Sequence, residues 1–139
     1  MRIPFETVKA ELKRVMMEAG LSEEQAEICA QTHAESSCDG VYSHGVNRVP
    51  RFIRYIRKGW VNINGKPELI KASGCLENYD GNLGIGIINA KLSMNRACEL
   101  AEKYGIGVVC LRNTTHWMRG GTYAWDAAKK GYMAICWTN

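Results

Sequence analysis

The order of residue patterns after residue 85 restricts the fold more than any other feature of the sequence. Between Ile85 and Tyr104, apolar side chains recur at helical spacing and stop before Gly105. The β-branched run IGVVCLR follows, then the helical pattern TYAWDAAKKG, and then the apolar run YMAICWT. Helix, strand, helix and strand in this order are typical of an α/β layer with a partly parallel sheet, and PELIKAS and CLENYDG are candidates for two earlier strands.

The amino-terminal half is predicted to be mainly helical. Apolar side chains at helical spacing predict a helix over residues 5–18. Ser22 followed by Gln25 is a capping-box pattern, which predicts a second helix ending near Ser37. His33 lies on or beside the inner face of that helix, so it is interpreted as a hydrogen-bonded packing residue.

These patterns predict an α/β fold in two segments. Residues 1–70 form a mainly helical amino-terminal segment, and residues 71–139 form an incomplete α/β segment. The run AICWTN reads as a buried strand that stops at Asn139 without a cap or a polar tail, which would expose apolar faces and ladder groups. We therefore expect a chain that is cut off within a domain.

Composition excludes several classes of protein. The chain has 139 residues, of which 46% are hydrophobic and 23% charged, as in an ordinary soluble domain or a piece of one. It has no apolar run of the roughly 18 residues that a membrane helix needs and no secretion signal, so a cytoplasmic protein without a membrane partner is expected. The six cysteines are scattered singly, without the spacing of a zinc site or a redox pair, and no metal is expected.

The net charge of +4 raises the question of nucleic-acid binding. Much of the basic surplus falls in RVPRFIRYIRKG, where the period of three drifts around a helix and does not form one stripe. Recognisable nucleic-acid motifs are missing, so a solvated face and no nucleic-acid partner are expected. A small basic binding module using Arg51, Arg54 and Arg57 is the alternative.

The stretch SHGVNR, residues 43–48, is the first candidate for chemistry. Ser43 is predicted to cap a helix that begins at His44, which would place His44 and Arg48 on one helical face with β-carbons about 5 to 6 Å apart. A guanidinium pairs bidentately with a carboxylate, and an imidazole with a free pKa of about 6.5 transfers protons near neutral pH. This pair suits a 2-oxo or 2-hydroxy acid, but the spacing also fits a plain helix cap with an exposed histidine and a solvated arginine.

The stretch NTTHWMRGG, residues 113–121, is the second candidate. It follows a predicted strand, and loops at the carboxyl ends of sheet strands commonly build ligand sites. The two glycines behind His116 allow close approach of backbone to a ligand. In the alternative interpretation, Trp117 and Met118 are packing residues and His116 is a turn residue. A third stretch, GNLGIGI, has the wrong glycine order for a dinucleotide loop and is interpreted as a helix-entry turn.

These motifs together resemble one known family. GVYSHGVNRVPRFI is similar to the signature near the start of the malate/L-lactate dehydrogenase-like oxidoreductases, and GIGVVCLRN, HWMRGG and KKGYMAICWTN extend the resemblance over essentially the whole chain. The resemblance implies a non-Rossmann, NAD-dependent dehydrogenase fold, with substrate-site residues in residues 1–70 and an incomplete cofactor-domain segment in residues 71–139. It further implies the cytoplasmic, NADH-dependent reduction of a small-molecule 2-oxo acid, usually by a homodimer.

The resemblance also implies roles for individual residues. It places the proton donor at His44, substrate contacts at Ser43 and Arg48, and a second active-site histidine at His116. Which histidine carries the proton stays open, with His44 favoured. Because family members are much longer, most NAD-binding residues would lie beyond Asn139 and none is assigned here. We expect the amino-terminal part of a reductase, and the alternative is a catalytically silent fragment.

Overall fold

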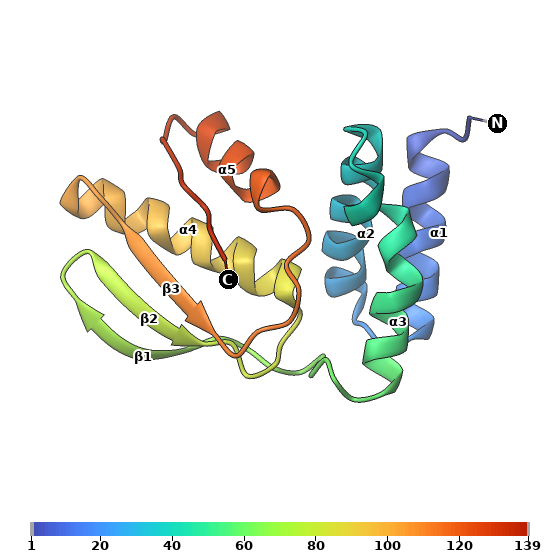
Figure 1. The fold of residues 1–139 in the computed structure, drawn as a ribbon, viewed down its shortest axis with the longest axis horizontal. Helices are drawn as coiled ribbons and strands as arrows, with labels where there is room; N and C mark the ends of the chain where they lie inside the picture. Colours follow the sequence, from blue (N-terminus) through green and yellow to red (C-terminus); the bar gives the residue numbers. More distant parts are fainter. Residues whose placement is uncertain (1, 139) are drawn as a thin grey trace. The chain divides into compact units, whose positions relative to one another are not determined.

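The computed structural model describes residues 2–138 and divides into two compact units, Met1–Ile63 and Asn64–Asn139 (Figure 1). The first unit is helical, and the second combines a three-stranded mixed sheet with helices. The predicted class, amino-terminal helices followed by a mixed α/β segment, is confirmed. The sequence places the boundary after residue 70, whereas the units meet between residues 63 and 64. Within residues 2–138, no helix has both the length and the apolar character of a membrane span.

The first unit is built on α1 (Phe5–Glu18) and α2 (Glu23–Cys38), which pack against each other. The predicted capping box starts α2, because Ser22 Oγ accepts from the Gln25 amide at 3.2 Å and Gln25 Oε1 accepts from the Ser22 amide at 3.0 Å. Gln25 Nε2 also donates to the Ile63 carbonyl oxygen at 2.7 Å. The last residue of the unit is thereby fastened to the first turn of α2.

His33 has the packing role that the sequence indicates. It is fully buried on α2, and its Nδ1–H donates to the Cys29 carbonyl oxygen at 2.8 Å. Its ring lies 5.9 Å from the ring of Phe52, a buried residue of α3 (Val49–Arg57). Pro50 lies in the first turn of α3, where its missing N–H costs no helical hydrogen bond. His33 therefore belongs to the helical core and carries no candidate chemistry.

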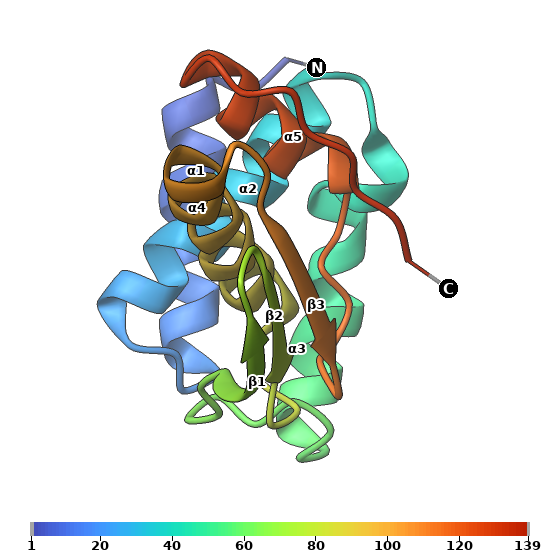
Figure 2. The same ribbon diagram turned by 90° about the vertical axis from the view of Figure 1, so that its left-hand side faces the viewer.

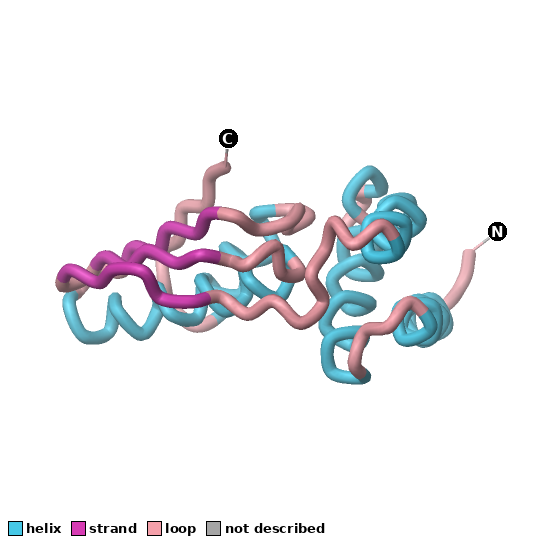
Figure 3. Tube along the Cα trace, turned by 90° about the horizontal axis from the view of Figure 1, so that it is seen from below, coloured by secondary structure: helices cyan, strands magenta, loops and turns pink. Residues whose placement is uncertain are grey.

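The second unit contains a sheet with the strand order β1-β2-β3, formed by β1 (Glu68–Ser73), β2 (Leu76–Asp80) and β3 (Val108–Arg112). β1 and β2 form an antiparallel hairpin whose turn includes Gly74 at φ +58°, a conformation that glycine adopts without steric cost. β2 and β3 run parallel, and the connection between them includes α4 (Gly86–Tyr104), which lies along one face of the sheet (Figures 2 and 3). The predicted strands PELIKAS, CLENYDG and IGVVCLR and the helix predicted between Ile85 and Tyr104 are confirmed.

An ion pair between the buried Glu77 and the half-buried Arg96 joins β2 to α4. Arg96 on α4 donates from Nε and Nη2 to the two carboxylate oxygens of Glu77 at 2.8 and 2.7 Å, and the Tyr79 hydroxyl donates to Glu77 Oε2 at 2.8 Å. These bonds hold the pKa of Glu77 at about 2, well below its ordinary value of 4.5, and the bonds from Arg96 make the largest contribution. The folded unit is therefore stabilised by the charged form of Glu77.

The prediction of a last strand over YMAICWT is wrong. After α5 (Gly120–Lys129), residues 132–138 form an irregular segment that pairs with no strand of the described sheet (red end of the chain in Figure 1). Met133, Ile135 and Trp137 are 95%, 77% and 74% exposed. An apolar alternating run becomes a strand only when another strand supplies the ladder and another layer covers its side chains, and neither is a property of the run itself.

Candidate functional site

The SHGVNR segment does not begin a helix, so that prediction is wrong. Two short 3₁₀ turns, Tyr42–His44 and Val46–Arg48, are joined at Gly45 and precede α3. A β-carbon on Gly45 would lie 2.0 Å from Ser37 Oγ, and the amide that follows Gly45 donates to the same oxygen at 2.9 Å. The segment is therefore shaped by its close approach to the end of α2, a contact that the local pattern does not contain.

His44 and Arg48 consequently lie in different turns, and the shared helical face inferred from their spacing is wrong. Both side chains are half-buried. Ser43 is not a helix cap; its Oγ lies 2.9 Å from His44 Nδ1. Arg48 takes part in none of the ion pairs formed within residues 2–138. A half-buried guanidinium without a protein carboxylate is able to bind a carboxylate ligand in its place.

The second candidate, His116, lies in the loop after β3, as the sequence predicts. Thr115 fastens this loop to the start of α4, since its Oγ1 accepts from the Gly86 amide at 2.9 Å and donates to the Gly84 carbonyl oxygen at 2.8 Å. A β-carbon on Gly86 would lie 2.1 Å from the Thr115 carbonyl oxygen. The loop therefore rests directly on the first turn of the helix, and Gly86 makes this approach possible.

Asn89 is a site-supporting residue that sequence reasoning missed. It is fully buried on α4, and its Nδ2 donates to the Gly81 carbonyl oxygen at 3.1 Å and to Thr114 Oγ1 at 2.9 Å. Asn89 thus ties the loop before α4 to the loop after β3. An asparagine within the apolar run of a helix was the available signal, because a buried amide needs polar partners.

Unusual backbone conformations collect in the same two loops. Among residues 2–138, the non-glycine residues with positive φ are Asn82, Leu83, Asn113 and Met118, at 50°, 53°, 50° and 64°. Such conformations cost free energy and persist where the surrounding contacts enforce them, often at functional sites. Two of the four are asparagines, which tolerate this region, but nothing in the sequence marks the leucine or the methionine.

His116 is exposed, while its neighbours pack into the unit. Met118 is buried, and its backbone amide donates to His116 Nδ1 at 2.9 Å. The Trp117 ring stacks on Tyr123 with centroids 5.6 Å apart, and the Tyr123 hydroxyl donates to the Trp117 carbonyl oxygen at 2.5 Å. The packing interpretation is therefore confirmed for Trp117 and Met118, and the His116 side chain is exposed to solvent.

The start of α4 does not offer a site for a dinucleotide phosphate. The amide of Gly86, at the start of α4, already donates to Thr115, and the backbone of residues 115 and 116 covers the place where a phosphate would approach. The glycines of residues 81–87 serve helix entry, as predicted. Within residues 2–138, no three His, Cys, Asp or Glu side chains gather closely enough to hold a metal ion.

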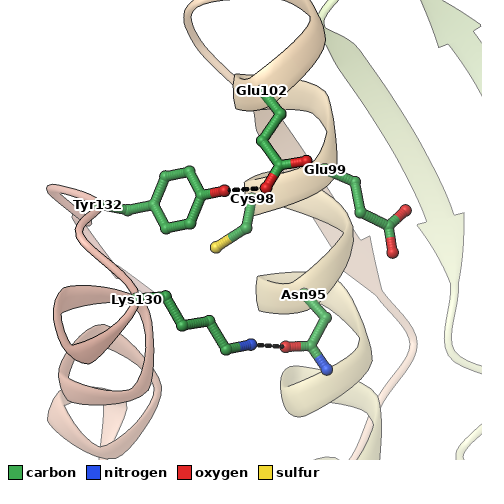
Figure 4. Close-up of a pocket in the computed structure, with 6 residues that line it drawn as sticks. All are labelled: Asn95, Cys98, Glu99, Glu102, Lys130 and Tyr132. Atoms are coloured by element: carbon green, nitrogen blue, oxygen red, sulfur yellow. Dashed lines mark hydrogen bonds between the residues drawn. The ribbon is translucent and has the colours of Figure 1, made fainter.

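A pocket of about 420 Å³ lies elsewhere in the second unit, between α4 and the chain after α5 (Figure 4). Lys130 Nζ donates to Asn95 Oδ1 at 2.9 Å, and the Tyr132 hydroxyl donates to Glu102. Burial raises the pKa of the Cys98 thiol, which keeps it protonated. These polar groups pair with one another, and the pocket is lined by none of the predicted site residues.

Comparison with known proteins identifies the class of protein that this fold and these residues define. The chain belongs to the malate/L-lactate dehydrogenase family, whose model matches residues 3–139. Over all 139 residues it is 48% identical to 2,3-diketo-L-gulonate reductase from Escherichia coli. Those residues correspond to 42% of the reductase, so the chain spans less than half the length of this curated relative.

Solved structures support the same family. Malate dehydrogenase from Pyrococcus horikoshii OT3 superimposes with a TM-score of 0.91 at 34% identity, over 94% of this chain and 38% of that one. Sulfolactate dehydrogenase from Methanocaldococcus jannaschii gives a TM-score of 0.88 at 31% identity, again over 94% and 38%. The predicted family resemblance and the dehydrogenase fold are confirmed.

Proposed function

We propose that this chain carries the substrate-side residues of a reductase that converts the ketone of a 2-oxo acid of the 2,3-diketo-L-gulonate type into an alcohol, with NADH as the hydride donor. The observation that carries the proposal is the 48% identity to 2,3-diketo-L-gulonate reductase across the whole chain. The names of the structural relatives, malate and sulfolactate dehydrogenase, denote 2-hydroxy acids, the products of such a reduction.

The local chemistry of the first unit suits this substrate class. Arg48 is half-buried and outside the ion pairs of residues 2–138, so its planar fork is able to hold the acid's carboxylate. Reduction of a ketone leaves an alkoxide oxygen that needs a proton. His44 supplies it from Nε2, while the Ser43 hydroxyl at 2.9 Å accepts the Nδ1–H of the cationic ring.

Acid binding to the chain itself tests this proposal. We would titrate 15N-labelled protein with 2,3-diketo-L-gulonate and compare the wild type with Arg48→Lys and the matched control Arg51→Lys, an exposed arginine on α3. A single ammonium cannot form the forked pair, and loss of one charge-assisted hydrogen bond weakens binding about tenfold. We expect that loss for Arg48→Lys and an unchanged affinity for Arg51→Lys. Equal affinity in all three proteins, or no binding to the wild type, would overturn the proposal.

A catalytically silent chain that still binds the acid is the second candidate. The observation that favours it is the covered amide of Gly86, since the first backbone donor of α4 is not free to bind a dinucleotide phosphate. We expect the 139-residue chain to bind NADH poorly and to oxidise it slowly or not at all. Stoichiometric NADH binding by calorimetry would contradict this. The homodimeric state and the cytoplasmic location implied by the resemblance stay predictions.

A further inference from the structure

The two candidate histidines differ in the group that bonds Nδ1. For His116 the partner is the backbone amide of Met118, at 2.9 Å. An amide N–H only donates, so Nδ1 of His116 must present its lone pair. For His44 the partner is the hydroxyl of Ser43, also at 2.9 Å, and a hydroxyl either donates or accepts. Nδ1 of His44 is therefore able to carry a proton without losing its hydrogen bond, whereas Nδ1 of His116 is not.

We infer that Met118 holds His116 as the neutral imidazole protonated on Nε2, so that His116 serves the reaction as a fixed hydrogen-bond donor and not as the proton donor. This role rests on the proposed function. Any oxygen that approaches Nε2 of the neutral ring meets an N–H. A carbonyl oxygen is such a group, and its partial charge grows as the ketone is reduced.

The direction of the Met118 amide is fixed by contacts on both sides. Met118 has φ +64° and a buried side chain, so its backbone is held in a conformation that a methionine seldom adopts. The preceding peptide is held by Trp117, whose ring stacks on Tyr123 and whose carbonyl oxygen accepts from the Tyr123 hydroxyl. Upstream, Thr115 is bonded to the start of α4. The donor that faces Nδ1 is therefore part of a loop that is held by contacts on both sides.

The two histidines differ in where the remaining ring proton lies after one proton has been transferred. A histidine that protonates an alkoxide begins with protons on both ring nitrogens, gives up the one facing the substrate, and ends neutral with a proton on the other nitrogen. In His116 that remaining proton would sit on Nδ1 and point at the Met118 N–H, two donors across 2.9 Å. Starting instead from the neutral ring, loss of the Nε2 proton would leave an anionic imidazole. In His44 the remaining Nδ1–H donates to Ser43 Oγ, so this ring completes the transfer without losing a bond.

Nitrogen NMR on the chain tests the tautomer without any substrate. With 15N-labelled protein, we expect a scalar coupling across the N–H···N bond between the Met118 amide and His116 Nδ1, and the shift of an unprotonated nitrogen at Nδ1. His116→Gln assigns the signals. Met118→Gly keeps both the amide and the positive φ, so the tautomer should persist in that variant. A proton on Nδ1 of His116, or an equal mixture of tautomers, would overturn the inference.

Substrate binding tests the donor role. Glutamine places an N–H near the position of Nε2, whereas phenylalanine keeps a ring without a donor. We expect His116→Gln to bind the 2-oxo acid within about threefold of the wild type and His116→Phe about tenfold more weakly, as for one lost hydrogen bond. Equal losses in both variants would refute the donor role while acid binding to the wild type upholds the proposed function. No binding to the wild type would refute the proposed function and the donor role with it, while the tautomer result would stand.

Discussion

Replacing Glu77 by glutamine tests whether the pair with Arg96 stabilises the second unit. The Glu77 side chain is 6% exposed, and glutamine keeps its size but turns an N–H2 toward the guanidinium donors. Removing one partner of a buried pair costs about 3–5 kcal/mol. Arg96 is 39% exposed and also bonds Glu99 at 2.7 Å, so its charge is not stranded. We therefore expect the free energy of unfolding to fall by about 2 kcal/mol, the range of hydrogen bonds to charged groups.

An exposed pair with the same geometry provides the control. On α1, Arg14 donates from Nε and Nη2 to the two oxygens of Glu11 at 2.8 and 2.6 Å, but these side chains are 54% and 59% exposed. Water and salt screen such a pair, so Glu11→Gln should leave the free energy of unfolding nearly unchanged. The contrast isolates burial as the cause.

The pH dependence follows from the lowered pKa of Glu77. Because this carboxyl titrates near pH 2 in the folded protein and near its ordinary 4.5 when unfolded, its charged form stabilises the fold. That contribution is fully present above pH 4.5 and is lost as the pH falls toward 2. The stability difference between the wild type and Glu77→Gln should therefore shrink across this window.

Urea unfolding followed by circular dichroism and by amide signals of α4 would measure the difference at about pH 7 and about pH 3. A stability gap that is the same at both pH values would refute the assignment of the effect to the Glu77 charge. A loss for Glu11→Gln as large as that for Glu77→Gln would refute the role of burial.

Two further substitutions test close approach and capping. Gly86→Ala places a β-carbon 2.1 Å from the Thr115 carbonyl oxygen and should destabilise the fold by about 1–3 kcal/mol in thermal melting. The control Gly121→Ala, whose β-carbon would have its nearest atom at 3.9 Å, should not lower stability. A Gly86→Ala protein as stable as the wild type would contradict the close packing of the loop on α4. Ser22→Ala removes the capping oxygen of α2 and should lower the free energy of unfolding, measured in urea, by about 1 kcal/mol. Ser22→Asn keeps a capping oxygen and should nearly retain the wild-type stability. A Ser22→Ala protein as stable as the wild type would show that water replaces the cap.

The elements that the sequence predicts correctly are those whose determinants lie within a few residues. The capping box of α2 spans Ser22 to Gln25, and α4 ends at Gly105, whose φ of +82° few other residues adopt. The β1–β2 turn likewise depends on Gly74. In each case one hydrogen-bond partner or one backbone conformation, written in the local sequence, decides where the element begins or ends.

The elements that the sequence predicts wrongly depend on distant residues. The turns of residues 42–48 are shaped by the Ser37 side chain, and a helix starting at residue 44 is the reasonable expectation without that contact. Residues 132–138 carry the pattern of a strand but lack a ladder partner among the described strands. Asn89 joins loops that are separated by some thirty residues, so the local sequence marks a buried amide that needs partners but does not indicate which loops supply them.

The candidate site shows the same limit at the scale of single atoms. His44, Arg48 and His116 are identified from residue type and family resemblance, and both histidines are chemically able to move a proton. What distinguishes the histidines is the partner of Nδ1, which lies one residue away for His44 and two residues away for His116. Proximity in sequence does not reveal the second partner, because the direction of the Met118 N–H depends on the backbone conformation of His116 and Trp117, which no sequence rule assigns. Residue identity therefore leaves two candidate proton donors, and the partner of each Nδ1 is the observation from which we infer that His44 and not His116 has this role.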